Sequence, residues 1–200
     1  LGSQVTVVEM TGDLLAGVDR DLVRPLFTRL KSQFHNIYLN TKVVSCELKD
    51  NKIEVQFEGE VKTASYDRIL VAVGRKPNTV DIGLESTGVK TDSNGFIQVD
   101  ARFQTDESSI FAIGDVIGGA MLAHKASAEG KDVVGILTGD EPIQKARTIP
   151  AVVFTDPEIA WCGLTETEAK NKDIKVQIVK FPWGASGRAQ PLGQPDGVTK

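Results

Sequence analysis

Two apolar runs that each stop at a glycine constrain the fold of this chain more than any other feature. The first reads SIFAIGD at residues 109–115, and the second reads DRILVAVGR at residues 67–75. An unbroken apolar run is typical of a buried parallel strand, and ligands of open α/β sheets bind just beyond the carboxyl ends of such strands. We therefore predict two strand exits that each face a nucleotide, with Asp115 placed to accept hydrogen bonds from the hydroxyl groups of a ligand.

The spacing of the other apolar residues predicts an α/β chain. Residues 4–9 alternate like a strand, and residues 18–30 repeat apolar side chains every four positions, as on one face of a helix that contains Pro25. Asp50 and Asn51 are typical of a hairpin turn between two short strands. The remaining expected elements are strands over 37–39, 42–48, 52–57, 61–65, 69–73, 110–113, 151–154, 159–163 and 175–181, and helices over 120–137 and from Thr165 onward.

Glu9 closes the first of these strands. In a dinucleotide-binding fold the second strand ends in an acid that accepts hydrogen bonds from the adenosine ribose. Its charge also repels a 2′-phosphate, which favours NAD over NADP, and residues 10–13 supply no arginine for such a phosphate. The alternative is an exposed acid at a strand end that binds no ligand.

The helix expected from Ala120 begins a few residues after Asp115. The first N–H groups of a helix lack partners within it and carry partial positive charge, which favours an anion. That anion is either a pyrophosphate or the N1–O2 edge of a reduced flavin. The alternatives are that Asp115 is an N-cap without a ligand, that Gly74 is an ordinary glycine between strand and loop, and that His124 is structural.

The composition argues against several other kinds of protein. A net charge of −4 gives no general attraction to nucleic acid or anionic lipid, and no apolar run is long enough to span a membrane. Cys46 and Cys162 stand outside any CxxC pattern, so we expect two buried or half-buried thiols, no metal site and a reducing, cytoplasmic compartment. Because the chain enters a strand almost at once after Leu1, we expect it to be an internal piece of a larger protein.

Read together, the motifs resemble those of the pyridine nucleotide–disulfide oxidoreductases. VAVGRKPN at residues 71–78 is similar to the exit of that family's NAD-binding domain, and IFAIGD at residues 110–115 is similar to its second flavin motif. Within the family the chain most resembles the bacterial dihydrolipoyl (lipoamide) dehydrogenase branch. That likeness rests on MLAHKA at 121–126, FTDPEIAW at 154–161, GLTE at 163–166 and FPWGASGRA at 181–189.

The resemblance implies a Rossmann-like α/β fold in three parts. Residues 1–79 would be the C-terminal part of an NAD-binding domain, residues 80–145 a central FAD-binding segment, and residues 146–200 the start of an α+β dimer-interface domain. It also implies oxidation of protein-bound dihydrolipoamide to lipoamide with reduction of NAD, as the dehydrogenase component of 2-oxo acid dehydrogenase complexes. The implied cofactors are FAD and NAD. The implied partners are a dihydrolipoyl-carrying acyltransferase or carrier protein and a second copy in a homodimer.

The same resemblance assigns roles to individual residues. It places the redox-active cysteine pair before Leu1 and the catalytic His–Glu pair after Lys200, so the chain itself carries no catalytic residue and should not turn over alone. The alternatives are another flavoenzyme of the family, such as mercuric or glutathione reductase, or a non-catalytic nucleotide-binding or interaction module. The implied cofactor contacts are Glu9 at the NAD ribose, Val43 at the adenine, Ala72, Val73, Gly74 and Arg75 at the nicotinamide, Asp115 at the flavin ribitol and Ala123 near the flavin ring.

Overall fold

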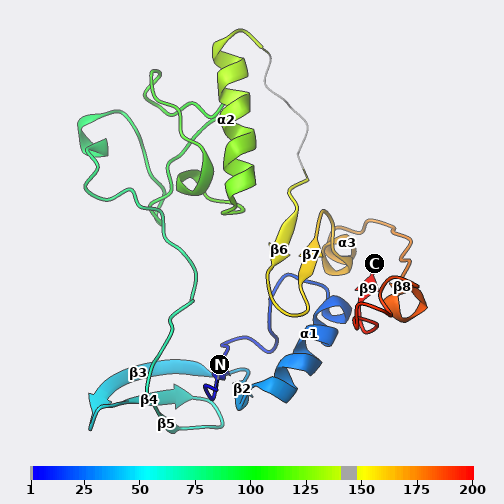
Figure 1. Ribbon diagram of the computed structural model, residues 1–200. Coiled ribbons are helices and arrows are strands. Elements are labelled where there is room, and N and C mark those ends of the chain that lie inside the picture. The colour runs from blue at the N-terminus through cyan, green and yellow to red at the C-terminus, as the bar shows by residue number, and fades with distance from the viewer. Residues whose placement is uncertain (1, 141–147) are drawn as a thin grey trace. The chain divides into compact units, whose positions relative to one another are not determined.

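The computed structural model describes residues 2–140 and 148–200, and the chain divides into two compact units (Figure 1). The first unit combines the chain up to Val71 with Val152–Lys200, and the second unit is Ala72–Ala151. Two distant stretches of sequence therefore build the first unit, and one continuous stretch builds the second.

The first unit opens with a β-α-β motif. Strand β1 (Thr6–Val8) and strand β2 (Asn36–Tyr38) pair in parallel, with Val7 opposite Ile37, and helix α1 (Arg20–Gln33) connects them. Parallel neighbours need such a crossover, and a helix is its usual form. Pro25 lies inside α1. The predicted strand, helix and strand are confirmed here.

A three-stranded antiparallel sheet follows in the order β3-β4-β5. Its strands are β3 (Lys42–Lys49), β4 (Lys52–Glu58) and β5 (Thr63–Tyr66). Asp50 and Asn51 have φ of 50° and 63°, which is the left-handed pair that a tight two-residue hairpin requires. Val55 and Phe57 are buried two positions apart on one face of β4. The predicted hairpin is confirmed.

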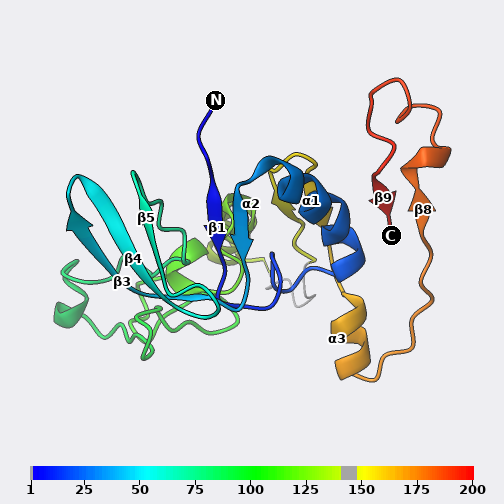
Figure 2. The same cartoon turned by 90° about the horizontal axis from the view of Figure 1, so that it is seen from below.

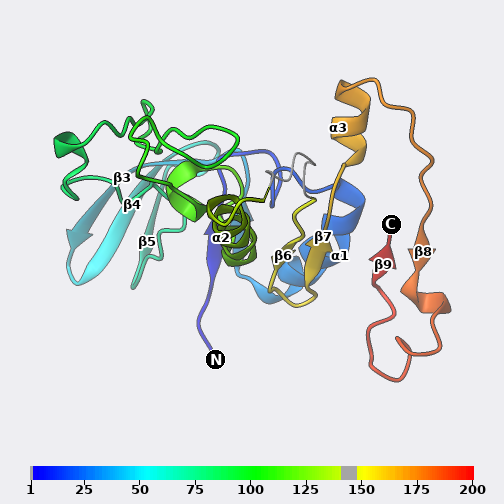
Figure 3. The same ribbon diagram turned by 90° about the horizontal axis from the view of Figure 1, so that it is seen from above.

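The core of the first unit joins the two ends of the chain. Val18, Val23 and Leu26 pack with Ile159, and Trp161 lies against this cluster. Figure 3 shows α1 beside the small sheet formed by β6 (Ala151–Val153) and β7 (Ile159–Trp161). The other elements at this end are α3 (Glu166–Asn171), β8 (Phe181–Pro182), η3 (Trp183–Ala185) and β9 (Val198–Thr199), with β8 and β9 antiparallel.

The second unit contains one long helix and a set of turns. Its elements are η1 (Leu84–Ser86), η2 (Gly114–Ile117) and α2 (Ala123–Leu137), and α2 packs on η2. Figure 2 shows the same elements from below. Two isolated antiparallel bridges, Thr91 with Ile97 and Gln104 with Phe111, hold the loops. No helix in the described part of the chain is long and apolar enough to cross a bilayer.

Three predicted strands are wrong. Residues 69–73 and 110–113 lie outside the strands, and of residues 175–181 only Phe181 lies in one. A strand exists only where a neighbour supplies hydrogen-bond partners, and no described residue pairs with 69–73, where Leu70 is 92% exposed. Residues 110–113 make one bridge, through Phe111. The apolar pattern of these runs was therefore insufficient to predict strand pairing.

Candidate cofactor site

Glu9 follows the last residue of β1, where the strand leaves the parallel pair. Its N–H donates to the carbonyl of Tyr38 at 2.8 Å, which extends the pairing by one residue. Its carboxylate Oε1 accepts the N–H of Thr11 at 2.7 Å and the Thr11 hydroxyl at 2.8 Å. The backbone hydrogen bond from Thr11, and then the side-chain one, lower the pKa of Glu9 below its usual 4.5. The side chain is therefore a half-buried, ionised acceptor at neutral pH.

The loop after Glu9 offers no free cation to a ligand. Residues 10–13 contain no basic side chain, and the nearest arginine in sequence, Arg20, donates to the carbonyls of Leu14 at 2.7 Å and Leu15 at 2.6 Å. It also donates to the carbonyl of Val18 at 2.5 Å. The Arg20 guanidinium is thus occupied by carbonyl groups of the loop. It does not neutralise the negative charge of the Glu9 carboxylate.

Val43 lies on β3 close to the same turn. The N–H of Thr41 donates to the carbonyl of Glu9 at 3.0 Å, so β3 begins against the end of β1. Val43 stands next to an irregularity in the β3-β4 register and is 45% exposed. The first unit therefore brings Glu9 and the start of β3 together and leaves the Val43 side chain accessible.

Residues 72–75 form an exposed irregular segment and not the end of a buried strand. Gly74 has φ of 113°, and a Cβ built on it would meet nothing within 4 Å. Arg75 Nη1 donates to the carbonyl of Met121 at 3.0 Å. Because Met121 stands two residues before Ala123, this bond links the predicted nicotinamide segment to the start of α2.

Asp115 lies in η2 and is exposed, so it is not sequestered in a packed interior. Its side chain accepts no hydrogen bond and forms no ion pair with any described residue, whereas its carbonyl accepts the N–H of Gly118 at 3.1 Å. The alternative that Asp115 caps the long helix is wrong, because Leu122 occupies the N-cap position of α2. The carboxylate is therefore free to accept hydrogen bonds from a ligand.

Helix α2 begins without a side-chain cap. No acceptor among the described residues lies on the N–H groups of Ala123, His124 and Lys125. Such groups at a helix start favour an anion. The ring Nε2 of His124 lies 2.7 Å from the carbonyl of Pro150, which gives this histidine a structural contact.

Lys125 and Glu129 hold the turn that carries Asp115, although the sequence had not singled out either as a site residue. Lys125 Nζ lies 2.8 Å from Glu129 Oε1, and the two side chains are only 9% and 12% exposed. Glu129 also accepts the N–H of Gly114 at 2.7 Å. The signal that could have found them is their spacing of four residues on a predicted helix.

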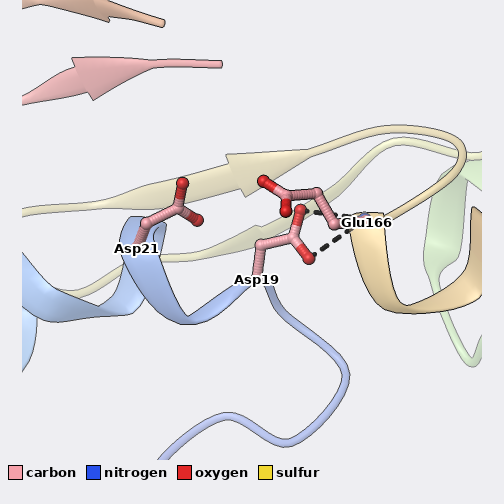
Figure 4. Close-up of side chains that lie close together, drawn as sticks. All are labelled: Asp19, Asp21 and Glu166. Atoms are coloured by element: carbon pink, nitrogen blue, oxygen red, sulfur yellow. Dashed lines mark hydrogen bonds between the residues drawn. The ribbon is translucent and has the colours of Figure 1, made fainter. Parts of the chain in front are cut away.

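A second cluster of charges joins the two ends of the first unit. Oxygen atoms of Asp19, Asp21 and Glu166 lie within 4.8 Å of one another (Figure 4). The ammonium group of Lys200 lies 2.8 Å from Asp19 and 3.1 Å from Asp21, and it also contacts Glu166. Burial opposes the charge of Lys200, but its hydrogen bonds to these carboxylates outweigh that effect and raise its pKa. The cluster therefore already holds a cation of the chain itself.

The structure also shows the environment of the two cysteines and a groove in the first unit. Both cysteines, Cys46 and Cys162, are free and exposed, so the expectation of buried or half-buried thiols is wrong. A groove of about 550 Å³ lies along β7 and includes Trp161 and Lys200 in its lining, whereas none of the predicted cofactor residues lines it.

Two family profiles match the chain. Residues 1–130 match the pyridine nucleotide-disulphide oxidoreductase profile, and residues 149–200 match the dimerisation domain of the same enzymes. The dihydrolipoyl dehydrogenase of Vibrio cholerae is 42% identical over all of this chain and 42% of its own length. That of Geobacillus stearothermophilus is 40% identical over all of this chain and 43% of its own length. The chain thus spans less than half the length of these curated relatives.

Solved structures agree with these matches. The HOCl-induced flavoprotein disulfide reductase RclA from Escherichia coli superimposes with a TM-score of 0.88 at 30% identity, over 98% of this chain and 45% of that one. LpdA from Mycobacterium tuberculosis superimposes with a TM-score of 0.88 at 26% identity, over 98% of this chain and 43% of that one. The predicted fold class is confirmed by these likenesses.

Proposed function

The chain belongs to the pyridine nucleotide–disulphide oxidoreductase family, and on that premise we propose that it is part of a dihydrolipoyl dehydrogenase. The whole protein would oxidise protein-bound dihydrolipoamide to lipoamide and reduce NAD. The observation that carries this proposal is the 42% identity to a dihydrolipoyl dehydrogenase across the full length of this chain. The family uses FAD and NAD, which agrees with the expected cofactors.

The residues around Glu9 fit the ribose of NAD. An ionised carboxylate can accept hydrogen bonds from two ribose hydroxyl groups, and here both hydrogen bonds from Thr11 lie on Oε1. A 2′-phosphate would meet this negative charge with no basic side chain in residues 10–13 to offset it. The site therefore favours NAD over NADP, with Val43 as the adenine contact.

The residues around Asp115 fit FAD. A free carboxylate and three helix N–H groups without acceptors match the hydroxyl groups and the anionic edge of a flavin cofactor, respectively. Gly114 supports the fit, because it has φ of 76° and a Cβ there would lie 3.0 Å from the Cβ of Ala126. Only glycine lets the backbone approach α2 so closely. Ala72–Arg75 would line the nicotinamide side, with Arg75 tied to Met121.

The role of this chain within the whole protein is to bind and orient the cofactors. The flavin supplies the hydride chemistry when bound, and the protein supplies its position and electrostatics. The chain contains two separated cysteines and no close cysteine pair, in keeping with a redox pair elsewhere in the protein. We further propose a homodimer, from the dimerisation-domain match, an acyltransferase or carrier protein that presents the dihydrolipoyl group, and a cytoplasmic location.

A second candidate is another flavoprotein disulfide reductase of the family. It is favoured by the superposition on RclA, whose description names disulfide reduction and not dihydrolipoamide oxidation. The two candidates differ in substrate. The full-length protein should reduce NAD with dihydrolipoamide and have a flavin absorbance band. A flavin band without that activity would favour the second candidate, and a colourless protein would rule out both.

Replacement of Glu9 tests the NAD site. In the full-length protein, Glu9→Ala is expected to raise the Kd for NADH by about tenfold or more, because a hydrogen bond to a charged group contributes ~1.5–3 kcal/mol. The affinity for NADPH should hold or improve. Asp13→Asn is the matched control, since Asp13 is an exposed acid of the same loop and pairs with Arg20 at 3.7 Å. An unchanged NADH affinity in Glu9→Ala would remove Glu9 from the site.

A further inference from the structure

Two side chains of α2 bind the backbone N–H and carbonyl groups of Gly114. Glu129 accepts the N–H of Gly114 at 2.7 Å, and Lys125 Nζ lies 3.3 Å from the carbonyl oxygen of the same residue. The two side chains also pair with each other at 2.8 Å. Lys125, Glu129 and the backbone of Gly114 therefore form a closed arrangement, which we call the Gly114 clasp.

Lys125 and Gly114 are buried and the Glu129 side chain is only 12% exposed, so the ion pair is largely withdrawn from water, and that position needs a reason. Ion pairs four residues apart on a helix surface contribute little, and burying them is costly unless further hydrogen bonds satisfy their donors and acceptors. Here the further partners are the N–H and carbonyl groups of Gly114, which reaches α2 at Ala126. Three residues on one face of α2 thus hold one residue of η2. Asp115 is the next residue, so the clasp fixes the point from which its carboxylate projects.

We propose that Lys125 and Glu129 are positioning residues for FAD, which rests on the proposed function for the identity of the ligand. They hold Gly114 so that the Asp115 carboxylate and the free N–H groups at the start of α2 keep one fixed spacing. Lys125 contributes to the clasp and to the helix start. Its side chain reaches the carbonyl of Gly114, and its backbone N–H is one of the free N–H groups at the start of α2. Neither side chain needs to touch the flavin for this role.

Exchanging the two charged residues distinguishes a role in holding Gly114 from a role as an ion pair alone. Lys125→Glu with Glu129→Lys restores opposite charges at the same spacing, but it turns an ammonium toward the Gly114 N–H and a carboxylate toward its carbonyl. Both new contacts are mismatched, donor against donor and acceptor against acceptor. Glu129→Gln keeps an acceptor for the Gly114 N–H and removes the charge. Lys90→Gln is the control, since it breaks the exposed Lys90–Asp106 pair of the same unit.

The measurements are made on the full-length protein. FAD affinity is measured by reconstitution of the apoprotein, the flavin environment by its visible absorbance spectrum, and stability by thermal unfolding of the apoprotein. We expect Glu129→Ala and the swapped double variant to weaken FAD binding by about tenfold or more and to shift the flavin spectrum. Glu129→Gln should lose less FAD affinity than Glu129→Ala. Lys90→Gln should match the wild type in FAD affinity and in flavin spectrum.

Two results would overturn the proposal. The first is a swapped variant that regains wild-type FAD affinity and spectrum, because the pair would then act only as an ion pair. The second is Glu129→Ala with unchanged affinity and spectrum. If the wild-type protein binds no FAD, the proposed function fails instead. The clasp is then still tested by amide hydrogen exchange at Gly114, which should quicken in Glu129→Ala and in the swapped variant but not in Lys90→Gln.

Discussion

At the scale of single residues, the two acids predicted to bind cofactors differ in what holds them. Thr11 fixes the Glu9 carboxylate with two hydrogen bonds, whereas the Asp115 side chain has no partner among the described residues and depends on its backbone for position. Their residue type and place after an apolar run could be predicted from sequence. What holds the turn before Asp115 could not, because Glu129 lies 15 residues from Gly114 in sequence.

A change at the Thr11 hydroxyl should shift the pKa of Glu9. Thr11→Val removes one of the two hydrogen bonds that lower the pKa of Glu9, so that pKa should rise toward 4.5. A lowered folded-state pKa stabilises the fold above the unfolded pKa, and the stabilisation is lost as the pH falls through the folded value. The valine variant should therefore lose less stability as the pH falls from about 5 to about 3, which is roughly the range in which carboxyl groups titrate. Carboxyl NMR shifts of Glu9 measure the pKa, and Thr11→Ser, which keeps the hydroxyl, should match the wild type.

At the scale of elements, those with local sequence signals formed where expected. Helix α3 has a capping box in which Thr165 and Glu168 satisfy each other's backbone N–H groups, and the β3-β4 hairpin has its turn at Asp50 and Asn51. Both signals depend on residues within a few positions of one another. The apolar run at 69–73 carries no such signal, because pairing requires a neighbouring strand from elsewhere.

Substitutions at Asn51 in the β3-β4 hairpin should change the stability of the fold. Asn51→Val should lower the free energy of unfolding by about 1–2 kcal/mol, because a β-branched residue is strained at the φ of 63° that this turn uses. Asn51→Gly should keep or raise the stability, since glycine adopts this region without a Cβ penalty. Urea unfolding of the full-length protein measures both. Equal stabilities for the two variants would contradict the assigned turn.

At the scale of the whole molecule, the first unit depends on contacts between distant parts of the sequence. Ile159 packs on Val18, Val23 and Leu26, and the Asp19 carboxylate accepts the N–H of Glu166 at 3.1 Å. The chain leaves this unit after Val71 and returns at Val152. The three-part division at residues 79 and 145 stays a prediction.

Ile159→Ala tests the division into two units. Ile159 is 5% exposed, and loss of its buried side chain should cost about 2–5 kcal/mol. A compact unit tends to open as one cooperative body, so amides of α1 should lose protection from hydrogen exchange while those of α2 keep it. Ile174→Ala is the control, because that side chain is 46% exposed. Equal loss of protection in α1 and α2 would mean that the two units unfold as one.

The sequence by itself determined the β-α-β motif, the hairpin, the two long helices and the family, because these depend on side-chain polarity and turn residues within short stretches. Tertiary structure alone decided that residues 69–73 and 110–113 do not form strands, that both cysteines are exposed, and that a buried lysine and a half-buried glutamate hold Gly114. The physical reason is that periodicity reports which side chains avoid water. Strand pairing and buried ion pairs also require the position of a partner, and that position is set by how the chain folds back on itself.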